Sequence, residues 1–280
     1  MQATGRSLDV LRTEIDRIDQ AILDLLIERT DIVREIAVVK GDRDGGRLAL
    51  RPAREAQLLR RLVGAAGDRF PAEVLVRMWR ELIASLTRLQ TPLSVAVHVS
   101  SDQPEIWDLA RDHFGSATPA NRVEGPGQAL QALNDGTAVA VLPLPQDGEL
   151  WWLPLMSDQG SGIRVFARLP FVECPASDDI HALALGRLEV EPSGDDLALL
   201  GIVATPQISA ERLLELLTEA GLPPSWSTKA PSGSEVMHLV EVETFVGEGD
   251  DRIDIFSRAA SGEILRVRSI GSYPRPLALT

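Results

Sequence analysis

The 280-residue chain is short of the residues that build disulfides and metal sites. It has one cysteine, Cys174, and four histidines that are scattered without ligand spacing. A single thiol excludes an intramolecular disulfide, and the sequence offers no Cys/His signature for a metal. Aromatic residues make up 4% of the chain, and no apolar run reaches the length of a membrane span. The start, MQATGRSLDV, lacks a signal-peptide core, so we expect a protein of the reducing cytoplasm.

The composition is that of a globular protein with buried cores. Hydrophobic residues account for 44% of the chain, and its length favours two or three domains. Residues 1–92 carry 16 Lys+Arg and 14 Asp+Glu, whereas the remainder carries 12 and 27. The acidic remainder argues against nucleic-acid binding. The first part, where cations lie among acids, suits a small anion better than a polyanion.

Residues 8–40 predict one long helix. Apolar residues recur at spacings of three and four, and neither Gly nor Pro interrupts them before Gly41: Leu8, Leu11, Ile15, Ile18, Ile22, Leu25, Ile32, Ile36 and Val39. At ~1.5 Å per residue, this helix would be roughly 50 Å long. One small domain cannot cover so long a stripe, so partner helices are required, and we expect a second copy of the chain to supply them.

Arg29 occupies the position where this spacing calls for an apolar residue. A buried arginine needs an anion or an acid beside it. Lys40 returns to the same face roughly 16 Å further along the axis, so both cations could converge on one dianionic molecule. Arg12 lies roughly 25 Å from Arg29 and could serve that ligand only from a partner chain. The alternative is that Arg29 fixes the register of a helical pair.

Two shorter helices are predicted next. Pro52 begins one, with Arg54 and Glu55 in its first turn, and Pro71 opens another, with Gln90 near its end. Taken alone, these polar residues could belong to a solvated first turn and a frayed terminus. We expect the third helix to bury one apolar face, formed by Val74, Leu75, Met78, Trp79, Leu82, Ile83, Leu86 and Leu89.

Together these features resemble the all-helical class of chorismate mutases over nearly the whole of residues 7–91. In that family, three helices from each of two chains interlock, and the long helix lends its first Arg to the partner's site. Arg51 and Leu86 depart from the acid and the serine of some members. The matching pieces are Leu11-Arg12-Thr13-Glu14-Ile15-Asp16-Arg17-Ile18-Asp19, Leu25-Leu26-Ile27-Glu28-Arg29, Lys40, Arg54-Glu55 and Gln90.

The resemblance implies the rearrangement of chorismate to prephenate, a unimolecular pericyclic reaction that needs no cofactor. A site accelerates it by holding the reactive conformer and by stabilising charge on the breaking ether oxygen. Arg12, Arg29 and Arg54 would bind the carboxylates. Lys40 and Gln90 would donate to the ether oxygen, and Glu55 would accept from the ring hydroxyl. The implied catalytic residues are Arg29, Lys40 and Gln90, and the implied substrate-binding residues are Arg12, Arg29, Lys40, Arg54, Glu55 and Gln90.

From residue 92 the pattern becomes that of an α/β protein. Helices are expected at residues 104–114, 128–133 and 211–221. Strands are expected at residues 93–99, 137–144, 161–171, 181–190, 197–205, 238–247 and 264–274, with a β-α-β-β-like ending.

This region resembles a shortened, degenerate prephenate dehydratase module followed by an ACT-like domain. The most specific matching piece is Val267-Arg268-Ser269-Ile270-Gly271-Ser272-Tyr273-Pro274-Arg275. The catalytic Thr-Arg-Phe of the dehydratases falls near Ile180-His181-Ala182, so that motif is missing. The phenylalanine-binding motifs of the ACT domain are not preserved either. The resemblance therefore implies a structural or regulatory extension without dehydratase activity.

We therefore expect a multidomain α and α/β protein with a mutase domain at residues 1–91, a dehydratase-like lobe at 92–195 and an ACT-like domain at 196–280. Its expected partners are the substrate chorismate and a second copy of the chain that shares Arg12, with neither nucleic acid nor a membrane. An aromatic-pathway enzyme or an amino-acid effector could engage the extension. The alternatives are an isochorismate pyruvate lyase, which shares the helical fold and the cationic site, and a degenerate mutase that acts as a regulatory binding protein.

Overall fold

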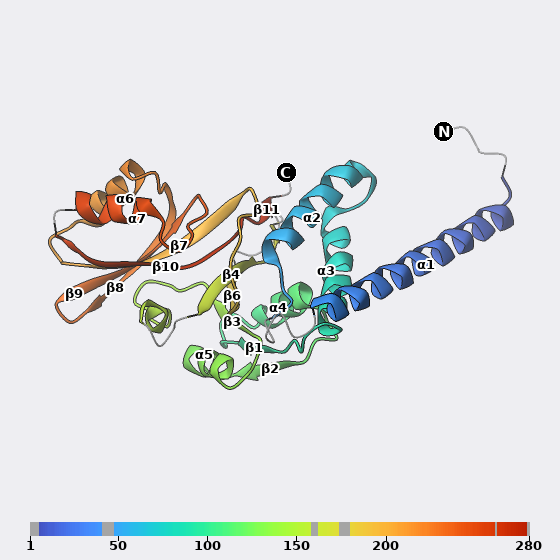
Figure 1. Ribbon diagram of the computed structural model, residues 1–280, viewed down its shortest axis with the longest axis horizontal. Helices are drawn as coiled ribbons and strands as arrows, with labels where there is room; N and C mark the ends of the chain where they lie inside the picture. The colour runs from blue at the N-terminus through green and yellow to red at the C-terminus, as the bar shows by residue number, and fades with distance from the viewer. Residues whose placement is uncertain (1–5, 41–47, 158–161, 174–179, 261, 279–280) are drawn as a thin grey trace.

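The computed structural model describes residues 6–40, 48–157, 162–173, 180–260 and 262–278. It shows a helical N-terminal region followed by a large mixed α/β sheet, which confirms the predicted fold class (Figure 1). None of the helices in these ranges is both long and apolar enough to cross a membrane.

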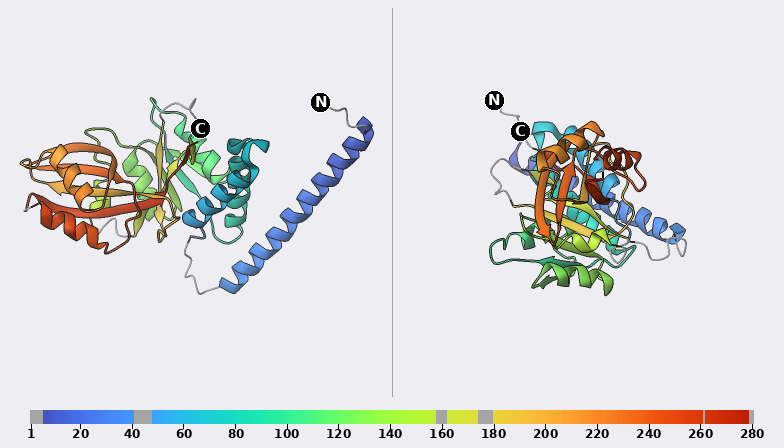
Figure 2. Two further views of the ribbon diagram at one scale, coloured as in Figure 1. Left: turned by 90° about the horizontal axis from the view of Figure 1, so that it is seen from above. Right: turned by 90° about the vertical axis from the view of Figure 1, so that its left-hand side faces the viewer.

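The first helix, α1, spans Leu8–Lys40, as predicted. It projects from the rest of the chain, and Figure 2 shows it lying apart from the next two helices. Its apolar stripe is exposed along the whole length, with Ile15, Leu25 and Ile32 at 57%, 63% and 50% exposure. A helix of this length gains stability mainly by packing its apolar face. One chain does not supply that packing for α1.

The second and third helices form an antiparallel pair. Helix α2 spans Pro52–Ala66, with Pro52 in its first turn, and α3 spans Ala72–Arg88. A short 3₁₀ turn, η2 at Gly67–Arg69, joins them. These bounds confirm the second and third helices predicted from the sequence.

The buried face of α3 agrees with the predicted one only in part, because Leu86 is buried as predicted, whereas Val74, Met78 and Leu89 are exposed. Val76, Arg80 and Ala84 are buried, in a helix that packs against α2 and against α4, Ile106–Phe114. Val74 and Met78 remain 43% and 52% exposed, so their predicted burial is wrong within one chain. The reason is that α3 is apolar on more than one face, and the α/β region covers only one of them.

A nine-stranded sheet is the centre of the α/β region. Its strands lie in the order β2-β1-β3-β6-β4-β10-β7-β9-β8. Its first part is mixed, with β1 parallel to β2 and β3, and β6 antiparallel to β3 and β4. The strands are β1 (Val95–His98), β2 (Ala120–Val123), β3 (Val139–Pro143), β4 (Ile163–Leu169), β6 (Ala182–Arg187), β7 (Asp196–Ala204), β8 (Pro224–Ser232), β9 (Glu235–Val242) and β10 (Ile264–Pro274).

The remaining elements flank this sheet. Helix α5 lies beside the β1–β3 end, and α6 and α7 lie together beside the β7–β10 end (Figure 1). Two short strands, β5 and β11, pair with each other in parallel. Their bounds are α5 (Pro126–Asn134), α6 (Ala210–Glu219), α7 (Asp251–Ala259), β5 (Val172–Glu173), β11 (Leu277–Ala278) and a 3₁₀ turn, η3 (Leu153–Met156).

The last part of the chain is a βαββαβ unit, made by β7, α6, β8, β9, α7 and β10. Its four strands are antiparallel neighbours, an arrangement typical of ferredoxin-like units. Gly271 of β10 pairs with Val165 of β4. This contact joins strands from both sides of the predicted boundary at residues 195/196 into one sheet. The three-domain division and the ACT-like assignment therefore stay predictions.

Candidate functional site

The predicted cations of α1 lie in different surroundings. Arg12 is exposed and pairs with Asp9 at 3.4 Å. Arg29 is half-buried, and its Nη1 is buried without a hydrogen-bond partner in the described part of the chain. Burial lowers the pKa of the Arg29 guanidinium, because desolvation disfavours its charged form. Lys40 ends the helix, and its side chain lies outside what the structure describes. Arg29 therefore combines a desolvated charge with an unused donor.

The first turn of α2 directs Arg54 and Glu55 differently. Arg54 is exposed, whereas Glu55 is partly buried and its Oε2 accepts a hydrogen bond from Arg80 Nη1 at 2.8 Å. Glu55 Oε1 accepts from the backbone N–H of Arg51 at 3.3 Å, which satisfies a donor at the helix start. The Glu55 carboxylate is thus fixed from two sides.

Arg80 is a residue whose importance the sequence analysis missed. Its side chain is 6% exposed, and its guanidinium carbon lies 4.9 Å from the centre of the Phe171 ring. The signal was available: Arg80 lies four residues from both Val76 and Ala84, so an arginine interrupts an apolar face here as Arg29 does in α1. Arg80 holds Glu55 at the junction between the helical pair and the α/β region.

His113 of α4 lines the same small cavity as Glu55 and Arg80. Burial, and then the charge of Arg80, hold the pKa of His113 well below its usual range. The imidazole is therefore neutral near pH 7. It packs against Phe114, with ring centroids 4.7 Å apart. His113 is therefore a packed, neutral side chain of this junction.

Gln90 lies just beyond α3, in the turn that ends the helix. It is half-buried, and its Nε2 donates to the carbonyl of Leu86 at 3.4 Å. That long bond leaves one amide hydrogen and the amide oxygen for other partners. The residue can still act as a donor to a ligand.

The structure does not bring into contact the five predicted site residues whose side chains it describes. Among the described side chains, no hydrogen bond or ion pair joins two of them: Arg12, Arg29, Arg54, Glu55 and Gln90. Helix α1 lies apart from α2 and α3 in the single chain (Figure 2). The composition of the site and its assembly with a second chain therefore both stay predictions.

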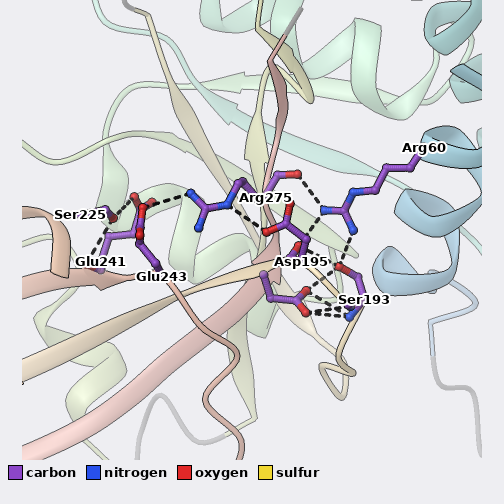
Figure 3. Close-up of polar contacts among 9 residues, drawn as sticks. Arg60, Ser193, Asp195, Ser225, Glu241, Glu243 and Arg275 are labelled. Carbon is purple, nitrogen blue, oxygen red and sulfur yellow. Dashed lines mark hydrogen bonds and ion pairs between the residues drawn. The ribbon is translucent and has the colours of Figure 1, made fainter. Parts of the chain in front are cut away.

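Helix α2 is attached to the α/β region by a polar cluster (Figure 3). Arg60 donates to Ser193 Oγ at 2.9 Å and to the backbone carbonyls of Asp195 and Arg275 at 2.7 and 3.0 Å. The Arg275 side chain in turn pairs with Asp195 at 3.0 Å and with Glu243 at 3.3 Å. The loop before β7 and the end of β10 therefore hold α2.

A second contact lies at the beginning of the same helix. Arg51 Nη2 pairs with both carboxylate oxygens of Glu191, at 3.0 and 3.1 Å. Gln57 Nε2 donates to the carbonyl of Ser193 at 3.3 Å. The α/β region thus sets the position of the helix that carries Arg54 and Glu55.

A third polar group lies within the α/β region, around the buried carboxylate of Glu241. Glu241 accepts from Tyr273 Oη at 2.6 Å, from Ser225 Oγ at 2.8 Å and from Arg168 Nη1 at 3.1 Å. Burial, and then the charge of Glu241, raise the pKa of Tyr273 well above its usual range, so the phenol remains a donor. We assign this group to stability, because buried polar atoms need such partners.

Residues 11–91 match the family model for chorismate mutase type II. This match confirms the resemblance predicted for the helical region. A bifunctional chorismate mutase/prephenate dehydratase of Pseudomonas aeruginosa is 32% identical over 113 residues, which are 39% of this chain and 31% of that relative. The alignment therefore spans less than a third of the relative's length.

Two solved structures are similar to the chain at low sequence identity. A structure described as GqqA, a novel type of quorum quenching acylase, is 15% identical with a TM-score of 0.49, covering 65% of this chain and 94% of its own. Prephenate dehydratase from Arthrobacter aurescens in complex with L-Phe is 10% identical with a TM-score of 0.47, covering 65% and 90%. Likenesses of this size carry no functional argument.

Proposed function

We propose that the helical region is a chorismate mutase that rearranges chorismate to prephenate, acting as a homodimer. The family match over residues 11–91 carries this proposal. The three helices α1, α2 and α3 support it, as do the polar residues that occupy the matching places on them.

The exposed apolar residues support the dimer. The stripe on α1 and the exposed Val74 and Met78 of α3 are large apolar surfaces that a monomer rarely leaves in water. A second copy would cover both with its own helices. It would also place its Arg12 in this chain's site, because Arg12 and Arg29 lie too far apart on one helix to share a ligand.

The reaction in such a site is intramolecular. One C–O bond breaks as one C–C bond forms, so no proton, electron or second reactant is exchanged. Arg29, Arg54 and the partner's Arg12 would bind the two carboxylates of the substrate. Lys40 and Gln90 would stabilise the developing charge on the ether oxygen.

Glu55 would accept a hydrogen bond from the ring hydroxyl. An ionised carboxylate offers about four acceptor positions, and the contacts with Arg80 and Arg51 leave some of them free. Arg80 would then be a positioning residue, since it fixes the carboxylate without contacting the substrate.

We further propose that the α/β region is a regulatory or structural extension without dehydratase activity. The position of the dehydratase motif holds Ile180-His181-Ala182, of which Ala182 is buried at the start of β6. His181 lies 4.0 Å from Glu173, and neither a threonine hydroxyl nor a guanidinium is present at these three positions. An amino-acid effector or an aromatic-pathway enzyme remains the proposed partner of this region.

Product identification tests these proposals. The purified chain is incubated separately with chorismate, isochorismate and prephenate, and products are identified by mass spectrometry. We expect prephenate from chorismate, and a dimer by light scattering. Pyruvate from isochorismate would instead favour the lyase, and turnover of none of the three would favour a binding protein. Phenylpyruvate from prephenate would overturn the assignment of a non-catalytic extension.

A further inference from the structure

The segment before α2, residues 48–51, meets the turn that follows α3, residues 89–94. The backbone N–H of Ala49 donates to Thr91 Oγ1 at 3.1 Å, although the two residues lie 42 positions apart in the sequence. This length is within the usual range for an N–H···O hydrogen bond. The Thr91 hydroxyl therefore fastens one segment to the other.

A shared core holds the same two segments. Leu50 and Leu93 are 6% and 4% exposed, and both belong to one hydrophobic cluster with residues of β1 and β3. The carbonyl of Ser94 accepts from the backbone N–H of Val139, the first residue of β3, at 3.0 Å. The α/β region therefore anchors both segments.

The end of α3 fixes the position of Thr91. Its backbone N–H donates to the carbonyl of Thr87 at 3.0 Å, and the backbone N–H of Gln90 donates to the same carbonyl at 2.9 Å. Pro92 follows, and a proline disfavours helical dihedral angles at the residue before it, so the helix does not continue. The Thr91 hydroxyl is thus held beside Gln90, the predicted donor to the ether oxygen.

The other segment leads to Glu55 within a few residues. Ala49 lies two positions before Arg51, whose backbone N–H donates to Glu55 Oε1 at 3.3 Å. The backbone N–H of Glu55 donates in turn to the carbonyl of Arg51 at 2.9 Å. A short path of covalent and hydrogen bonds therefore runs from Gln90 through Thr91 and Ala49 to Glu55.

We propose that Thr91 is a positioning residue for the mutase reaction, because its hydroxyl sets the place of Gln90 relative to Glu55. This role rests on the proposed mutase function. A group that stabilises a transition state loses its effect when it is displaced, and a misplacement of about 1 Å is enough to lower a rate about 100-fold. Loosening this contact should therefore slow the reaction more than it weakens substrate binding.

Removal of the hydroxyl tests this role. Thr91→Val keeps the size of the side chain and loses the acceptor, whereas Thr91→Ser keeps the hydroxyl. We expect kcat for chorismate to fall about tenfold in Thr91→Val, with KM changed less than about twofold, because Gln90 acts on charge that develops only in the transition state. Thr91→Ser should retain most of the wild-type kcat.

Ser94→Ala is the matched control. The Ser94 hydroxyl also accepts from a backbone N–H, that of Ala138 at 3.4 Å, but this bond leads to the start of β3 instead of to Ala49. The substitution should leave kcat unchanged, and circular dichroism and thermal melting establish that each variant is folded. An unchanged kcat in Thr91→Val, or an equal loss of kcat in Thr91→Ser or in Ser94→Ala, would overturn the proposal.

A double variant tests whether Thr91 acts through Gln90. If it does, the loss in Gln90→Ala already includes the effect of Thr91, so Gln90→Ala/Thr91→Val should be no slower than Gln90→Ala alone. Losses that simply add would show that Thr91 acts elsewhere, and would overturn its role in positioning Gln90.

Hydrogen exchange tests the contact without relying on catalysis. The amide of Ala49 should exchange faster in Thr91→Val than in the wild type, and at the wild-type rate in Thr91→Ser. Equal exchange in Thr91→Val and in the wild type would contradict the anchoring. A wild-type chain without mutase activity would overturn the proposed function, whereas the exchange of Ala49 would still decide whether Thr91 holds the two segments.

Discussion

Glu55 of α2 and Arg80 of α3 form a buried ion pair at 2.8 Å, with side-chain exposures of 13% and 6%. It joins a predicted substrate-binding residue to a helix face that packs on the α/β region. A buried pair stabilises only while both charges are present, because removal of one leaves the other uncompensated.

Replacement of Arg80 should therefore be strongly destabilising. We expect Arg80→Met to lower the free energy of unfolding by about 3–5 kcal/mol, measured by urea denaturation. The control is Arg77→Ala on the same helix, which removes an exposed pair with Asp112 and should change stability by less than about 1 kcal/mol. Similar losses of unfolding free energy in both variants would show that the Glu55–Arg80 pair stabilises the fold no more than an exposed ion pair does.

Arg29→Ala should abolish most of the mutase activity while keeping the fold. The charged hydrogen bonds of a desolvated arginine contribute roughly 3–5 kcal/mol, so kcat/KM for chorismate should fall by at least ~100-fold. Helix content should be unchanged, since alanine is the better helix former. Arg34→Ala, which removes an exposed arginine paired with Asp31, is the matched control. Near-normal activity in a folded Arg29→Ala protein would contradict its role as a ligand.

Mixing Arg12→Ala with Arg29→Ala should restore activity if Arg12 acts in the partner's site. Subunit exchange produces hybrids in which one site carries both changes and the other carries neither. Activity is measured against time after mixing, and exchange is followed separately with labelled chains. Proven exchange without recovery would exclude the shared-site arrangement.

Stability should fall as the solution is acidified from about pH 7 to about pH 5.5. The pKa of His113 lies well below 6.5 in the folded chain, so the unfolded chain takes up a proton in this range before the folded one does. Well above pH 6.5 the imidazole is neutral in both states and no stability is lost. Below it, the loss is at most about 1.4 kcal/mol per pH unit for one such group.

His113→Gln should flatten this dependence. His238, whose pKa burial and then Lys229 also lower, should account for part of the remaining slope. The measurement is urea denaturation across the pH range for the wild type, His113→Gln and His238→Gln. An unchanged slope in His113→Gln would show that His113 is not titrating as expected.

Arg60→Ala should loosen α2 without affecting helix formation. It removes three hydrogen bonds to the loop before β7 and to the end of β10. We expect a loss of about 1–3 kcal/mol in stability and faster hydrogen exchange in the first turn of α2. Arg61→Ala removes an exposed neighbour and serves as the control. Equal hydrogen exchange in the two variants would show that Arg60 does not hold α2 in position.

The sequence predicted α1 to its terminal residues, because neither Gly nor Pro interrupts residues 8–40 before Gly41. On α3 it predicted the burial of Leu86 but not that of Val76, Arg80 and Ala84, since an arginine and an alanine weaken the apolar pattern of that face. Which face is covered depends on the α/β region, which local periodicity does not report. The same periodicity identified Arg29 as an exception in α1, and applied to α3 it would have identified Arg80.

Strands β2 and β8 and helix α7 are among the elements that the sequence analysis missed, and each has a local reason. Strands β2 and β8 are at the edges of the sheet, where alternating polar residues are tolerated on an exposed side. Helix α7 contains acids among few apolar residues, and its best signal is Asp250, whose side chain accepts from the backbone N–H of Arg252 at the helix start. The attachment of α2 depends on Arg60 and Arg275, which lie 215 residues apart, so no local pattern reveals it.

The pairing of Gly271 with Val165 has a consequence for how this chain can be divided. A Cβ atom at Gly271 would lie 2.1 Å from the Val165 carbonyl oxygen, so only glycine allows the two backbones to meet there. A fragment that ends before β7 would expose β4 as a long unpaired edge, and such edges recruit other chains into aggregates. The α/β region should therefore be expressed as a whole, and a larger residue at position 271 should weaken the contact between β4 and β10.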